Sequence, residues 1–176
     1  MNITPSTGFL TGLNNLVNNF SGPIFTITSA LGLIIGIHSL MGIANEHKTN
    51  SGYRGHFIGL CIGSILIALG SFVQMAGNTL GIQGAVSGLA YNPAATSAST
   101  TSLQYVYTAY NVITLGGWFA VIKGLFMVYH MENNHHGDHS FAKAFVFIVF
   151  GTACANIIVV LGMIHNQFSI TFPGIN

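Results

Sequence analysis

The stretch Tyr110–Ile164 decides the fold, because it holds two apolar runs around a polar loop: YNVITLGGWFAVIKGLFMVYH (110–130), MENNHHGDHSFAK (131–143) and AFVFIVFGTACANIIVVLGMI (144–164). Each run has about 21 residues, which at ~1.5 Å per helical residue spans the ~30 Å hydrocarbon core of a bilayer. The sequence therefore predicts a membrane hairpin of two helices over residues 109–168.

The composition fits a membrane protein. Hydrophobic residues make up 51% of the 176 residues and charged residues only 4%, whereas a soluble domain normally carries about 25% charged residues. A net charge of +1 excludes a basic surface for nucleic acid, so we expect no specific nucleic-acid binding. Three acidic residues and no nucleophile motif also argue against an enzyme. We expect no catalytic residue, metal or cofactor.

The first half of the chain predicts a second hairpin, over residues 21–80. Pro23 suits the first turn of a helix, and the apolar runs Ile24–Ala44 and Phe57–Ala76 enclose the polar loop NEHKTNSGYRGH. Residues 1–20 predict an amphipathic segment, 81–108 a small-residue linker and 169–176 a tail. The predicted fold is all-α, with four transmembrane-type helices as two tandem helical hairpins.

The two hairpins look like copies of one unit. A shift of 88 residues, half of 176, pairs them without a gap and matches nine positions: Thr26/Thr114, Ile34/Ile122, Gly36/Gly124, Asn45/Asn133, His47/His135, Phe57/Phe145, Gly63/Gly151, Met75/Met163 and Asn78/Asn166. Chance matching of glycine-rich apolar runs is the alternative, but the register holds from the first span through the loop. We therefore favour a parallel tandem duplication.

The basic residues give a membrane orientation. Lys48 and Arg54 lie in the first loop, Lys143 borders the second loop, and Lys123 lies in the third span toward that same loop. The positive-inside rule then places both loops in the cytoplasm, and both termini and the middle linker on the outer side of the membrane. Lys123 either extends its ammonium to the headgroups, or meets a lipid phosphate or a polar lumen in an assembly.

Small residues recur at helical spacing and predict helix packing. The positions are Gly32, Gly36, Gly55, Gly59, Gly63, Gly124 and Gly151. Such stripes let neighbouring backbones approach closely. They serve packing within the chain, or, where four spans cannot bury them all, contacts between identical subunits.

Histidines crowd the second loop, at His130, His135, His136 and His139. Imidazole clusters bind transition metals, but no HExxH or Cys–His spacing fixes a geometry here. A solvated polar loop is the favoured interpretation, and a His-rich metal-binding membrane protein or transporter is the alternative.

The segments GGWFAVIKGLFMVYHM and FAKAFVFIVFGTACANIIVVLGM, with the polar loop around Gly137 between them, resemble the IcmC/DotE-like small membrane proteins of type IVB secretion systems and I-type plasmid conjugal transfer. The resemblance covers both hairpins and rests on a Gly-containing span, a charged turn, and a second span opening before a glycine such as Gly63 or Gly151. The many histidines and sparse basic residues depart from that pattern. The chain is more distantly similar to conjugative pilins, two-span hairpins that leave the inner membrane to form a helical tube with phospholipid.

The resemblance implies a self-assembling structural subunit of a conjugation or type IV secretion apparatus in the bacterial inner membrane, first of all a conjugative pilin in a filament with bound phospholipid. In such a filament Lys48, Arg54, Lys123 and Lys143 would face the lipid headgroups or the lumen, and in the membrane both termini would face the periplasm. The alternative within the same apparatus is an inner-membrane scaffold or channel component. The expected partners are identical subunits, membrane lipid and other secretion-system subunits, and DNA is expected only as transported cargo.

Overall fold

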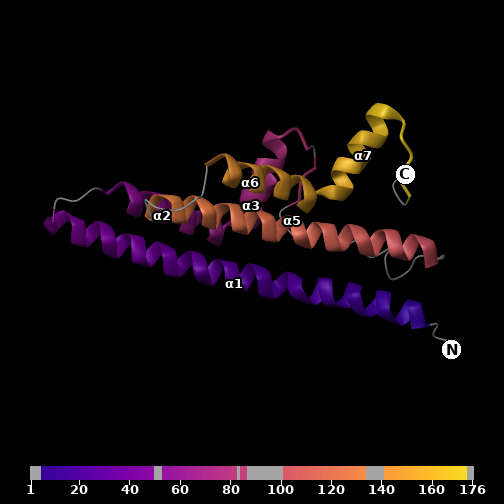
Figure 1. The fold of residues 1–176 in the computed structure, drawn as a ribbon, viewed down its shortest axis with the longest axis horizontal. Coiled ribbons are helices and arrows are strands. Elements are labelled where there is room, and N and C mark those ends of the chain that lie inside the picture. Colours follow the sequence, from indigo (N-terminus) through magenta and orange to yellow (C-terminus); the bar gives the residue numbers. More distant parts are fainter. Residues whose placement is uncertain (1–4, 50–52, 83, 87–100, 134–140, 174–176) are drawn as a thin grey trace.

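A computed structural model describes residues 5–49, 53–82, 84–86, 101–133 and 141–173. Its helices are α1 (Pro5–Thr49), α2 (Arg54–Ile67), α3 (Leu69–Thr79), α5 (Thr101–Asn133), α6 (Phe141–Ala155) and α7 (Ile157–Phe168) (Figure 1). No strand occurs in these ranges, so the prediction of an all-α fold is confirmed.

Two helices are long and apolar enough to cross a membrane, over Thr11–Asn45 and Leu103–Met131. The pairs α2–α3 and α6–α7 meet the same criterion only if each pair counts as one bent span, which raises the total to four. The membrane assignment made from the sequence therefore holds at the level of length and composition.

Helix α1 is longer than the predicted first span, with 45 residues and a length of ~67 Å. It passes without interruption through the boundary expected at residue 20, and Pro23 lies inside it instead of in its first turn. Beside Pro23, the Thr26 hydroxyl donates a hydrogen bond of 3.1 Å to the Gly22 carbonyl. The buried side of this amino-terminal part is formed by Asn14 and Val17, while Phe9 is 69% exposed. Of the apolar residues in this part, Val17 is thus packed and Phe9 is not.

The predicted second and fourth spans are each broken. Helices α2 and α3 meet at 93° and helices α6 and α7 at 77°. The break residues, Ala68 (φ −101°, ψ 32°) and Asn156 (φ −113°, ψ 29°), both leave helical geometry. Since 156 − 68 = 88, the two breaks stand at the same position of the repeat seen in the sequence.

The chain therefore contains two similar units, which we call the first unit (α1–α3) and the second unit (α5–α7). Within each unit the long helix packs on the helix that follows it, α1 on α2 and α5 on α6. Helices α1 and α5 run side by side in the same direction, as the colours of Figure 1 show. Their parallel course is what a tandem copy of one unit produces.

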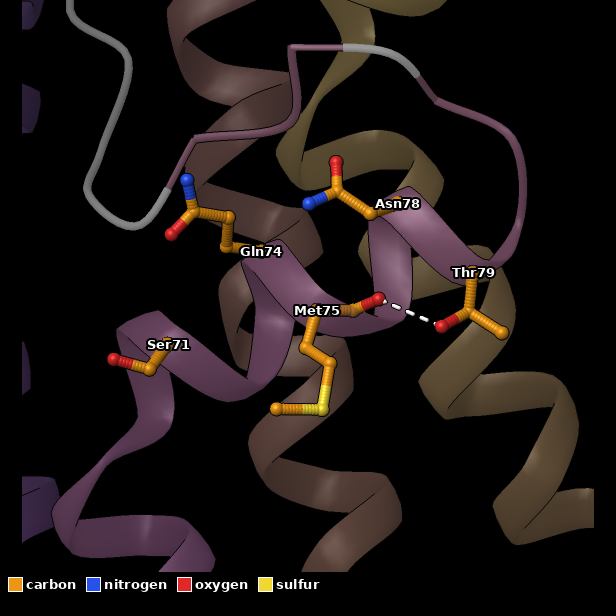
Figure 2. Close-up of a pocket in the computed structure, with 5 residues that line it drawn as sticks. All are labelled: Ser71, Gln74, Met75, Asn78 and Thr79. Atoms are coloured by element: carbon orange, nitrogen blue, oxygen red, sulfur yellow. Dashed lines mark hydrogen bonds between the residues drawn. The ribbon is translucent and has the colours of Figure 1, made fainter.

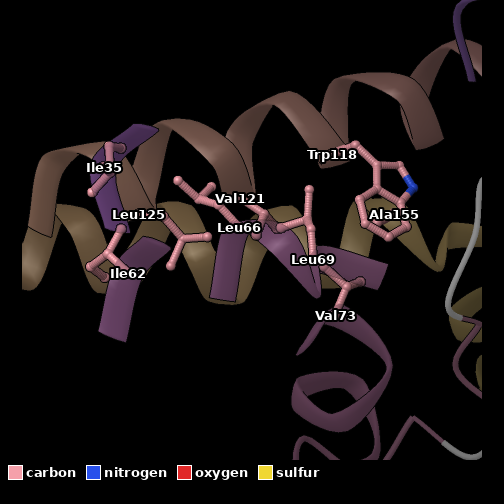
Figure 3. Close-up of a cluster of buried hydrophobic side chains, with 9 residues drawn as sticks. All are labelled: Ile35, Ile62, Leu66, Leu69, Val73, Trp118, Val121, Leu125 and Ala155. Carbon is pink, nitrogen blue, oxygen red and sulfur yellow. The ribbon is translucent and has the colours of Figure 1, made fainter. Parts of the chain in front are cut away.

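The core lies where the two units meet. Its buried apolar residues come from the first unit (Ile35, Ile62, Leu66, Leu69, Val73) and from the second unit (Trp118, Val121, Leu125, Ala155) (Figure 3). Trp118 is fully buried, and its ring stands edge-on to Phe25 of α1 with centroids 4.9 Å apart.

The segment expected to be a small-residue linker is partly structured. Gly81 and Gly84 have φ values of +81° and +84°, which L side chains rarely adopt. The turns that they form bring Ile82 and Ala85 into the interior. Residues 101–108, also assigned to the linker, form the first two turns of α5; residues 87–100 lie outside the described ranges.

The surface of the fold is more apolar than that of a soluble protein, and several polar residues lie inside beside the apolar core. Leu33, Ile34, Ile37, Leu40 and Met41 are each more than half exposed along α1. The buried polar residues are Asn14, Thr28, Ser39, Thr108, Asn111, Thr114, Thr152 and Asn156. Soluble proteins bury the first kind and expose the second, whereas a lipid-facing surface favours the reverse.

Candidate functional site

The closest helix contact of the first unit is the crossing of α1 and α2. The space beside a glycine can be judged from where a Cβ atom would stand if the residue were alanine. On Gly63 this Cβ would lie 2.8 Å from the Gly32 carbonyl oxygen and 2.9 Å from the Gly36 nitrogen, which is closer than ordinary contact. A Cβ on Gly32 would lie 2.7 Å from the Gly63 oxygen and 3.0 Å from the Ile67 nitrogen. Both glycines are buried, so here the two backbones touch each other directly, with no side chain between them.

The second unit has a matching crossing between α5 and α6. A Cβ on Gly151 would lie 2.8 Å from the Val121 nitrogen and 2.9 Å from the Gly117 oxygen, and a Cβ on Gly124 3.0 Å from the Ala144 oxygen. Gly151 is the repeat equivalent of Gly63, so the same glycine makes the crossing in both units. Its partner on the long helix differs: Gly117 and Val121 stand one turn before the equivalents of Gly32 and Gly36.

The remaining predicted glycines divide between contact and open space. A Cβ on Gly59 would collide with the Ser39 hydroxyl and lie 3.2 Å from Tyr129 Cε2 of α5. A Cβ on Gly36 would have no heavy atom within 4 Å. Gly55 is half-buried in the first turn of α2. An added side chain at Gly32, Gly59, Gly63, Gly124 or Gly151 would therefore meet other parts of the chain, whereas at Gly36, whose backbone lies in the α1–α2 crossing, it would point into open space.

A buried pair of asparagines joins the two long helices. The Asn111 side-chain amide donates a hydrogen bond of 2.7 Å to the Asn14 side-chain oxygen, and both residues are at most 1% exposed. An amide pair in an apolar interior favours one register of the two helices, because a shift would break the hydrogen bond between them.

Asn156 ties the break in the second unit to the turn that follows α3. Its side-chain nitrogen donates a hydrogen bond of 2.9 Å to the Thr152 carbonyl. Its side-chain oxygen accepts a hydrogen bond of 2.9 Å from the Val86 backbone N–H. Three buried atoms of the described residues have no hydrogen-bond partner: Thr114 Oγ1, Trp118 Nε1 and Thr152 Oγ1. The polar interior is thus concentrated beside the α5–α6 crossing and the α6–α7 break.

The cationic residues are exposed where the structure describes them. The Lys123 ammonium lies 4.8 Å from the centroid of the Phe147 ring of α6, a cation–π geometry. Arg54 is in the first turn of α2 and Lys143 in the first turn of α6, and both are exposed. The side chain of Lys48, in the last turn of α1, falls outside the described part of the chain.

The histidines that the structure describes are spread over several helices. The His130 Nδ1 atom is 2.9 Å from the Phe126 carbonyl, and His165 Nδ1 is 2.9 Å from the Ile170 carbonyl. His56 contacts the position where a Cβ on Gly42 would stand. Within the described ranges, no three His, Cys, Asp or Glu side chains gather into a metal-sized group; His135, His136 and His139 lie outside those ranges.

Two hollows occur on the surface of α3. A shallow pocket of about 500 Å³ is lined by the polar side of the helix, with Ser71, Gln74, Asn78 and Thr79 around Met75 (Figure 2). A more apolar groove of about 350 Å³ lies between α3 and α6, lined by Phe72, Met75, Ala76, Thr79, Leu80, Phe145, Ile148, Val149 and Thr152. Neither hollow holds an ionisable side chain, so both are suited to apolar chains or polar uncharged groups and not to acid–base chemistry.

Compared with protein-family models, with curated proteins and with solved structures, the chain shows no match in any of the three.

Sequence reasoning missed several residues that the structure brings together. Asn14, Asn111 and Asn156 were passed over, although an amide inside an apolar run is a visible signal for a helix contact. Gly117 is not among the predicted packing glycines. The signal for its close contact is the pair Gly116–Gly117 directly before Trp118, the single tryptophan of the chain.

Proposed function

We propose that this chain is a structural membrane subunit that self-assembles through helix packing. The observation that carries the proposal is the apolar surface of the fold, on which large hydrophobic side chains face outward along α1 and α6. Such a surface needs lipid or further protein to cover it. The backbone crossings at Gly63 and Gly151 support the same function, because they hold a unit together without a water-driven hydrophobic core.

The finer form of this proposal is two tandem hairpins, each crossing an inner membrane twice. The loops around Lys48, Arg54 and Lys143 then face the cytoplasm and both termini face the periplasm. Lys123 is two to three turns from the end of α5 and reaches the headgroup layer, where a lipid phosphate offers a better partner than the Phe147 ring.

The resemblance of the two apolar segments and their loop to conjugal transfer proteins points to the apparatus. In that setting the subunit is a pilin, packed as a helical filament with phospholipid. Its partners are other copies of this chain and further secretion-system subunits.

A membrane-resident scaffold or channel component is the second candidate, and the helix breaks at Ala68 and Asn156 favour it. Broken helices at membrane depth are tolerated where they are buried in protein or line a cavity. A filament of straight hairpins has no need of such breaks.

Fractionation tests the two candidates. Filaments sheared from cells and the remaining membranes are probed for this chain. Enrichment in filaments supports the pilin; filaments that lack the chain while membranes retain it overturn the pilin and leave the scaffold. A Lys123→Ala variant is expected to retain less phospholipid or to give a lower filament yield, and Lys143→Ala, at the exposed start of α6, is the matched loss of charge outside the span.

A further inference from the structure

The two units meet through unlike surfaces. Helix α2 of the first unit packs on α5, and α3 packs on α6. If the units faced each other through the same surface, α6 would pack on α1 and α7 on α2 in the same way. Among the described residues, neither α1 and α6 nor α2 and α7 form a contact as extensive as these. The first unit thus uses one face against the second unit, and the second unit answers with a different face.

This asymmetry leaves one face of the second unit open. In the first unit, Ile62, Leu66, Leu69 and Val73 are buried against the second unit. Adding 88 to these numbers gives the equivalent positions in the second unit: Phe150, Cys154, Ile157 and Leu161. All four are apolar, yet Phe150 is 66% exposed and the other three are only half-buried. We call these four residues the donor face.

The opposite face is open on the first unit. Trp118, Val121, Leu125 and Ala155 of the second unit are buried in the core cluster that joins the two units, with Val121 and Ala155 also in the α5–α6 crossing. Subtracting 88 gives Ala30, Leu33, Ile37 and Ile67, which we call the acceptor face. Leu33 is 53% exposed, Ile37 51% and Ile67 45%, and Ala30 is also exposed. On a helix of 3.6 residues per turn, Leu33 and Ile37 point away from Ile35, which is buried in the core.

We propose that the donor face of one copy of this chain binds the acceptor face of a second copy. The contact repeats between chains the one that joins the two units within the chain. It deepens the proposed function and rests on the self-assembly stated there. Lipid could also cover two apolar faces. A second copy fits them better, because each open face carries the same repeat positions as a face that is already buried against the other unit inside the chain.

One position departs from the apolar pattern. Ile35 is buried in the internal interface, and its equivalent in the second unit is Lys123. The ammonium of Lys123 lies over Phe147, one turn before Phe150, and so at the loop end of the donor face. A lipid phosphate at this edge neutralises the charge when the two copies meet, which joins lipid binding to assembly.

A contact between unlike faces repeats without limit. Each copy that docks leaves a new donor face at one end and a new acceptor face at the other, so copies add as an open filament or close into a ring. A contact between like faces would instead stop at a dimer.

Thiol cross-linking tests the contact. Phe25 and Trp118 touch across the internal interface at 4.9 Å between ring centroids, and their equivalents are Ile113 and Ala30, both exposed. Of the two free cysteines, Cys61 is first replaced by alanine, and Cys154, a member of the donor face, by valine, which keeps an apolar side chain there. Membranes carrying Ala30→Cys together with Ile113→Cys are then treated with a short bifunctional thiol reagent.

The double variant is expected to give a ladder of dimers, trimers and larger species, and each single variant only monomer. Ala30→Cys combined with Gln74→Cys, on the exposed polar side of α3, is the matched control without a ladder. Trp118 emission checks that each variant is folded. Dimers from a single variant would overturn the proposal, because they would show that identical faces of two copies meet. If the double variant gives only monomer, the proposal is also overturned and both faces are assigned to lipid.

The outcome is separable from that of the proposed function. A ladder in membranes, with sheared filaments that lack the chain, keeps the interface and removes the pilin. Filaments that contain the chain but give no ladder keep the pilin and remove the interface.

Discussion

Adding a single methyl group at Gly63 should separate α1 from α2. The Cβ of Gly63→Ala would stand 2.8 Å from the Gly32 oxygen and 2.9 Å from the Gly36 nitrogen, whereas ordinary contacts begin at 3.4 Å. The obstacle is backbone on both sides, which cannot rotate away as a flexible side chain can. The two helices must therefore move apart by about half an ångström, and overpacking of this kind costs ~1–3 kcal/mol.

The matched control lies in the same crossing. A Cβ on Gly36 meets nothing within 4 Å, so Gly36→Ala gains only the ~1 kcal/mol by which alanine exceeds glycine in a helix. Gly63→Ala gains the same propensity term, and the difference between the two variants therefore isolates the steric cost. We expect Gly63→Ala to be less stable than Gly36→Ala by ~1–3 kcal/mol.

Equilibrium unfolding in detergent micelles with increasing SDS measures this difference. The single tryptophan, Trp118, is fully buried at the interface of the two units, so its emission follows their separation. Free energies of unfolding that agree within about 0.5 kcal/mol for the two variants would refute the backbone crossing. Gly151→Ala with Gly116→Ala, whose Cβ also meets open space, repeats the comparison in the second unit.

Three further experiments probe the polar interior and the turn after α3. Asn156→Ala removes the acceptor of the Val86 N–H, so the free energy of unfolding should fall by ~1–3 kcal/mol. Hydrogen exchange of the Val86 amide should become faster, and an unchanged exchange rate would contradict the hydrogen bond. A double-mutant cycle of Asn14→Ala and Asn111→Ala should give a coupling of about 0.6 kcal/mol and at most ~1.7, and strictly additive losses would argue against a direct pair. Gly84→Ala places a side chain at φ +84° and should cost ~1–2 kcal/mol, which a lowered midpoint of thermal unfolding would report.

The helices and the repeat register could be predicted from the sequence because both depend on local patterns. Apolar runs of about 21 residues set the positions of α5 and of most of α1. The amino-terminal extension of α1 through Pro23 could not be predicted, since the local rule places proline in a first turn. What holds the extension is the long-range bond between Asn14 and Asn111.

The helix breaks also lay beyond local rules. Neither Ala68 nor Asn156 adjoins a proline, and the apolar runs continue across both positions. At Asn156 the side chain bonds to Val86, 70 residues away, and no pattern within one helix carries that information. Nothing in the structure explains the break at Ala68 in the same way, because alanine has no side chain to make such a bond.

The glycines of the candidate site were recognisable by spacing, but their partners were not. A stripe such as Gly59 and Gly63 predicts that something approaches closely, and only the fold shows that it is α1, with Tyr129 of α5 beside Gly59. The open faces were invisible for a further reason. Their definition compares burial at repeat-equivalent positions, which no sequence pattern contains.

The break at Ala68 has a consequence for the lipid around the protein. Before its bend, α2 has 14 residues and a length of ~21 Å, and α6 has 15 residues and ~22 Å. Both are shorter than a ~30 Å hydrocarbon layer, while α1 beside them exceeds it. A bilayer around the protein would thin beside the short helices α2 and α6, and the long helix α1 would tilt to fit the hydrocarbon layer. In the membrane-resident form proposed above, this thickness mismatch would favour contacts between copies at their thinned flanks and would concentrate the protein in the thinner parts of a membrane.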